Sequence, residues 1–65
     1  MKRAEAQKAI DEAFTDGLKN LFSMLERNLL QQGETTAVSE FERGVAKYDQ
    51  AHTIATSVIE KVFHE

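Results

Sequence analysis

Apolar residues in the first half of the chain recur with the spacing of an α-helix. When residues are placed about 100° apart around a helix axis, the large apolar side chains fall within an arc of roughly 120°. These residues are Ile10, Phe14, Leu18, Leu21, Phe22, Leu25 and Leu29. The pattern predicts an amphipathic helix over about residues 3–32.

The second half of the chain carries a seven-residue repeat. Its three parallel rows are Phe41, Tyr48, Ala55 and Val62; Val38, Val45, His52 and Ile59; and Ala37, Gly44, Ala51 and Val58. A repeat of this length is typical of helices that pack against nearly parallel or antiparallel neighbours. We therefore expect a second helix over about residues 36–64.

A turn is expected between these two segments. The cluster Gly33-Glu34-Thr35-Thr36 holds breaking and capping residues, and the chain contains no proline. Gly33 suits the left-handed position that ends a helix, and Thr35 or Thr36 can cap the next one. The sequence predicts a single all-α domain over residues 1–65, a two-helix antiparallel hairpin with its turn at about 33–36.

Small residues indicate where the two helices touch. The third row of the repeat is small at Ala37, Gly44 and Ala51. The first helix has its own small residues at one edge of its apolar stripe, namely Ala6, Ala13 and Gly17. Because small residues let two backbones approach closely, we expect these two sets to form the contact inside the hairpin.

The apolar surface is too wide for one hairpin to cover. On the second helix it spans roughly 160°. Two hairpins packed face to face would bury it as a homodimeric four-helix bundle, and a different helical protein could supply the missing helices instead. The expected association surface consists of Leu18, Leu21, Phe22, Leu25, Phe41, Tyr48, His52 and Ile59.

Composition strengthens the case for a partner. The chain has 65 residues and no cysteine. A domain of this size buries only roughly 60% of the surface that its unfolded chain exposes. Without cysteine, neither disulfides nor thiolate zinc sites can stabilise it, so self-association, another partner or an unusually good core must do so.

His52 is the residue with the most chemical potential. Asp49 and His52 have the carboxylate-x-x-His spacing of metal sites in helical bundles. Such a site also needs an inward carboxylate from the first helix, where only Asp11 leans inward. We therefore expect no metal or other cofactor, and a partly buried imidazole that meets Tyr48, Thr56 or a partner chain. Whether His52 senses pH or binds a ligand stays open.

Charge and hydroxyl residues bear on the remaining function classes. Arg43, Lys47 and Lys61 form a possible basic contact line on the second helix, but acids outnumber bases by 11 to 8. The basic line makes a small dimeric nucleic-acid-binding regulator an alternative. The excess of acids argues against nucleic acid as the partner. No serine has a neighbouring base, so enzymatic activity is not expected.

These features together favour a non-enzymatic protein-protein interaction or assembly module. A carboxylate and histidine metal-binding bundle is the other alternative. The sequence shows no apolar run of about 18 residues and no signal-peptide pattern, so we expect a cytoplasmic location and no membrane partner.

Overall fold

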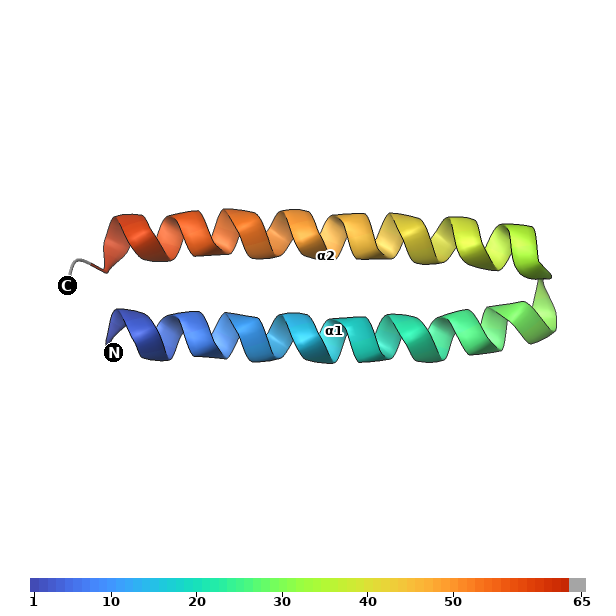
Figure 1. Cartoon of the computed structure of the whole chain (residues 1–65), viewed down its shortest axis with the longest axis horizontal. Coiled ribbons are helices and arrows are strands. Elements are labelled where there is room, and N and C mark those ends of the chain that lie inside the picture. Colours follow the sequence, from blue (N-terminus) through green and yellow to red (C-terminus); the bar gives the residue numbers. More distant parts are fainter. Residues whose placement is uncertain (64–65) are drawn as a thin grey trace.

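The computed structural model describes residues 1–63, which form two long antiparallel helices (Figure 1). Helix α1 spans Arg3–Gln31 and helix α2 spans Glu34–Val62. The start of α1 and the end of α2 lie side by side at one end of the molecule, and the turn lies at the other. The prediction of an all-α helical hairpin is confirmed.

The turn consists of two residues, Gln32 and Gly33. Gly33 has φ 87° and ψ 166°, a conformation that costs glycine little because it has no Cβ. The Gln32 amide donates to the Asn28 carbonyl at 2.7 Å, which is the last bond of α1. The Ala37 amide donates to the Gly33 carbonyl at 3.1 Å, which is the first bond of α2.

The second helix begins two residues earlier than the sequence predicts. Glu34 opens its first turn, where a carboxylate interacts favourably with the positive end of the helix dipole. Thr35 and Thr36 are therefore helical, and no side chain makes the expected capping bond. At the other end α2 stops at Val62, and the end of the predicted range at 64 lies outside the described residues.

Glycine on one helix packs against a large side chain on the other. A Cβ added to Gly44 would lie 2.6 Å from Leu21 Cδ2, and one added to Gly17 would lie 2.5 Å from Tyr48 Cε1. A Cβ at either position would force the facing side chain to shift, so glycine fits there without rearrangement. The two glycines therefore let α1 and α2 approach closely, as their size predicts.

The rest of the small-residue contact is only partly as expected. Ala6 and Ala37 are buried, but Ala13 and Ala51 are exposed and Val58 is 52% exposed. The reason is that a heptad row drifts by about 20° per repeat around a straight helix. The row leaves the contact along α2, and Ile59, which is buried, belongs to a different row.

The hairpin has a thin core. Its buried apolar residues are Ala6, Leu21, Ala37 and Ile59, and the described part contains no large side chain that is fully buried. The Cα radius of gyration is 15.0 Å, against about 11 Å for a compact domain of this length. The molecule is a flat rod of 48 × 15 × 8 Å, so both broad faces of the hairpin are open.

Candidate interaction face

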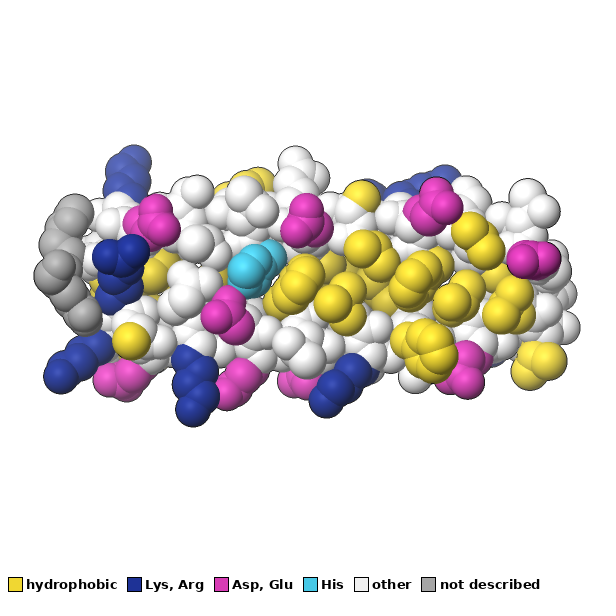
Figure 2. All heavy atoms as spheres, viewed as in Figure 1, with side chains coloured by type: hydrophobic (Ala, Val, Ile, Leu, Met, Phe, Trp, Pro, Cys, Tyr) yellow, Lys and Arg dark blue, Asp and Glu magenta, His cyan; other side chains and the backbone are white. Residues whose placement is uncertain are grey.

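One broad face of the hairpin is apolar over the half nearest the turn. Figure 2 shows hydrophobic side chains gathered over both helices there, while the half nearest the termini is mostly polar. We call this surface the apolar half. Phe14 and Leu18 of α1 and Phe41 and Val45 of α2 line a groove in it. Helical spacing puts four more apolar residues on the same face, namely Phe22, Leu25, Leu29 and Val38.

The two helices form a shallow groove in the apolar half. The groove has a volume of about 390 Å³, and Phe14, Leu18, Phe41 and Val45 line it. Acidic side chains stand along its α2 edge, at Glu42 and Asp49. Apolar side chains that surround an open groove are typical of a surface that packs against another helix.

Several side chains of the apolar half are largely in contact with solvent. Phe22 is 56% exposed, Leu29 is 44% exposed and Val38 is 39% exposed. Each is an apolar group whose transfer out of water would stabilise an assembly by about 25 cal/mol per Å². The single hairpin leaves that stabilisation unused.

The expected association residues divide between this face and the hairpin interior. Leu18, Phe22, Leu25 and Phe41 lie in the apolar half. Leu21 and Ile59 are instead buried within the single hairpin. Leu21 packs over Gly44 of the other helix. Tyr48 covers Gly17 and is 39% exposed.

Polar pairs join the two helices in the other half of the same face. We call them the polar ladder. Its rungs are Arg3 with Glu60 (3.8 Å), Gln7 Nε2 donating to Thr56 Oγ1 (3.1 Å), and His52 Nε2 donating to Asp11 Oδ1 (2.6 Å). The rungs step by four residues on each helix, which keeps them on one face.

His52 forms the rung next to the apolar half. Its ring lies against Phe14, with ring centroids 4.7 Å apart, and its Nε2 donates to Asp11. The imidazole is therefore bonded to Asp11 of α1 and not to Tyr48 or Thr56, and its contact with a partner chain stays a prediction. Asp11 also accepts a bond from Gln7 Nε2 at 2.9 Å.

The arrangement around His52 also bears on the metal alternative. Asp11, not Asp49, is the carboxylate bonded to the imidazole. Among residues 1–63, no three His, Cys, Asp or Glu side chains are close enough together to hold a metal ion. The described geometry therefore supports a polar contact between helices at this position.

The His52 hydrogen bond lowers the pKa of Asp11 below its ordinary 3.8, and the bond from Gln7 lowers it further. A lowered pKa means that ionised Asp11 stabilises the fold above pH 3.8, and that this contribution disappears as the pH falls through the pKa of the folded state. We expect Asp11→Asn to be less stable than the wild type at neutral pH. The effect is small, because the Asp11 side chain is 53% exposed.

Urea unfolding of both chains over a range of pH checks this expectation. The difference in unfolding free energy should narrow as the solution becomes more acidic than pH 3.8. A difference that stays constant from neutral to strongly acidic solution would show that Asp11 acts through something other than its charge.

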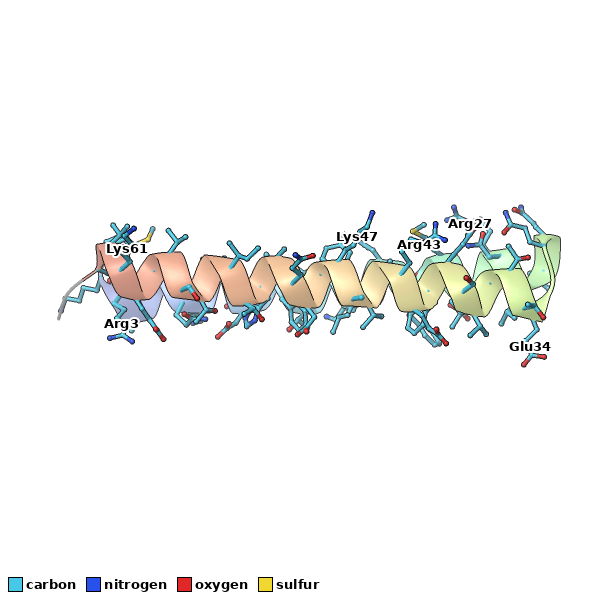
Figure 3. The ribbon with its side chains drawn as sticks, turned by 90° about the horizontal axis from the view of Figure 1, so that it is seen from above. Arg3, Arg27, Glu34, Arg43, Lys47 and Lys61 are labelled. Atoms are coloured by element: carbon cyan, nitrogen blue, oxygen red, sulfur yellow. The ribbon has the colours of Figure 1, made fainter. Side chains whose placement is uncertain are left out.

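The opposite broad face carries basic side chains. Figure 3 shows Arg43, Lys47 and Lys61 on one side of the molecule, together with Arg27 from α1. Arg3 and Glu34 point to the other side. The sequence predicts the three residues of α2, since they share one helix. Arg27 joins them only through the packing of α1 against α2.

Comparisons with models of known protein families, with curated proteins and with solved structures found no match for this chain. Within residues 1–63, neither helix combines the length and the apolar character needed to cross a membrane.

Proposed function

We propose that the protein is a non-enzymatic interaction or assembly module that acts as a homodimeric four-helix bundle. The observation that carries the proposal is the apolar half, a continuous apolar surface over both helices in which Phe22, Leu29 and Val38 are exposed. Large exposed apolar patches of this kind mark association surfaces.

The accessible surface of the single hairpin is larger than that of a compact monomer by about the area of one side of a protein interface. The hairpin exposes 5029 Å². A compact monomer of 7.3 kDa would expose about 4,200 Å². The excess of roughly 830 Å² is close to the about 800 Å² that each partner buries in a standard protein interface.

A second helical hairpin is a suitable cover for this face. Two hairpins packed through their apolar halves place four helices around a shared core, as in other four-helix bundles. Residues such as Leu18, Leu25 and Phe41 then become core residues. The same patch is used on both subunits, as a two-fold dimer requires.

Native mass spectrometry of the protein isolated from its own host tests this proposal. We expect a species of twice 7.3 kDa that carries no other component. A complex of one chain with a different protein would replace the homodimer by a heteromeric bundle. A metal-loaded species would favour the metal alternative, and a folded monomer would refute the proposal.

The basic face favours a second candidate function, binding to nucleic acid. The observation behind it is that Arg27 extends the line of Arg43, Lys47 and Lys61 onto the other helix (Figure 3). Several cations on one face can follow a phosphate backbone. The net charge of -3 limits the affinity that such a face would provide.

Neutralising the α2 cations separates this function from simple solvation. If the face binds nucleic acid, the variant R43Q/K47Q/K61Q should bind an oligonucleotide at least tenfold more weakly than the wild type. The slope of log K against log salt should also flatten by nearly one for each lost phosphate contact. Fluorescence anisotropy at several salt concentrations measures both. Equal, weak binding by both chains would mean that the cations only keep the face hydrated.

A further inference from the structure

We infer that the two hairpins of the dimer pair with their turns at the same end, related by a two-fold axis along the length of the rod. This inference rests on the proposed homodimer and names its geometry. Two features of the interaction face carry it, the unequal halves of the face and the charges along its edges.

The first feature is the division of the face along its length. The apolar half occupies the end near the turn, and the polar ladder occupies the end near the termini. With the turns at the same end, apolar half meets apolar half and ladder meets ladder. With the turns at opposite ends and the rods fully overlapped, each apolar half would lie on a polar ladder, where burial of polar groups is costly.

The second feature is the pair of edges that border the face. On the outer edge of α2 the charged residues are all acids, since Glu42, Asp49 and Glu60 lie about 40–60° from Val45 around the helix. Two of these line the groove of the apolar half. The outer edge of α1 contains the lysines Lys8 and Lys19.

The α1 edge is mixed in charge, because it also carries acids. Glu12 forms an ion pair with Lys8 at 4.0 Å, and Glu26 lies on the same edge nearer the turn. Cations are thus present on the α1 edge and absent from the α2 edge. A partner edge that lacks cations would leave Glu42 and Asp49 with no cation opposite them, whereas Glu60 already pairs with Arg3 of its own chain.

The two arrangements bring different edges together. With the turns at the same end, α2 of one copy lies on α1 of the other. The contacts of Gly17 with Tyr48 and of Leu21 with Gly44 place Lys19 at a level between Glu42 and Asp49. Lys19 therefore lies on the edge that this arrangement brings next to the α2 acids, so a cation of one copy can approach Glu42 and Asp49 of the other.

With the turns at opposite ends, α2 lies on α2 and α1 on α1. The acidic edge of one copy then faces the acidic edge of the other, and sliding the rods along each other does not change this. Like charges in close contact are unfavourable, so the edges select the same arrangement as the apolar half does.

Spin labels on single cysteines can distinguish the arrangements, because the natural chain has no cysteine. Gln32→Cys places one label in the exposed turn, and Lys2→Cys places one before α1. For each variant, electron double resonance measures the distance between the labels of the two subunits, and sedimentation establishes the mass of the same sample.

We expect both variants to give distances near about 20 Å, the width of two packed helices of about 10 Å each. Fully overlapped rods with turns at opposite ends would give values close to the 48 Å length of the hairpin for both labels. Rods overlapped only through their apolar halves would give a much longer distance at Lys2→Cys than at Gln32→Cys.

The label distances test the arrangement of the hairpins, and the sedimentation mass tests the homodimer itself. Long distances in a sample that sediments as a dimer would overturn the arrangement and leave the homodimer intact. The absence of any dipolar signal in a sample that sediments as a monomer would overturn the homodimer, and the arrangement with it.

Discussion

The Phe22→Glu variant is expected to be a monomer at concentrations at which the wild-type chain is a dimer. Phe22 is 56% exposed in the single hairpin and lies in the apolar half, so the proposed dimer would bury its ring. The substitution removes that apolar contact and places a carboxylate opposite another chain. Loss of such a residue costs about 2 kcal/mol or more, and the dissociation constant should rise at least about 30-fold. Sedimentation equilibrium of both chains measures the change.

Ile54→Glu is the matched control for this prediction. Ile54 has the same exposed fraction, 56%, but belongs to the opposite, basic side of α2. The Ile54→Glu variant also replaces an exposed apolar side chain on a helix with a carboxylate. We expect it to remain a dimer. If Ile54→Glu dissociates and Phe22→Glu remains a dimer, the interface lies on the opposite, basic face.

The Gly44→Leu variant is expected to lose much of the stability of the hairpin. A Cβ at position 44 would lie 2.6 Å from Leu21 Cδ2, and the remaining atoms of a leucine would have to occupy the same space. Overpacking of this kind costs about 1–3 kcal/mol. Removing a glycine from a helix gains about 1 kcal/mol. The variant is therefore less stable than the wild type only if the leucine forces the two helices apart. Leu21 is buried, so little room exists for it to move.

The measurement is thermal unfolding by circular dichroism at one fixed protein concentration, because association shifts the midpoint. Each kcal/mol should lower Tm by about 4–8 °C in a chain of this size. Gln50→Leu adds the same side chain at an exposed position of α2 and should leave Tm nearly unchanged. A Gly44→Leu chain as stable as Gln50→Leu would show that the helices do not approach closely at this level.

Both helices and the face they share could be predicted from the sequence because hydrophobic spacing reports directly on helical periodicity. The apolar stripe from Ile10 to Leu29 predicts which surface of α1 packs against other helices. It does not predict how that stripe divides. Leu21 packs against Gly44 inside the hairpin, whereas Leu18 and Phe22 remain on the open face. The division depends on the angle at which α2 meets α1.

The polar ladder could not be predicted because it depends on the register of the two helices. A turn of two residues places Asp11 opposite His52. The predicted turn of about four residues would have moved each residue of α2 along α1. Local sequence signals gave Asp49 as the nearest carboxylate to His52, and only the register brings the more distant Asp11 to the imidazole.

The mass of the wild-type chain in solution, measured by sedimentation equilibrium over a wide range of concentrations, tests the proposed dimer most directly. We expect a reversible equilibrium that approaches twice 7.3 kDa as the concentration rises. A helical chain that remains at 7.3 kDa at every concentration would show that the apolar half stays in contact with water and that no dimer forms.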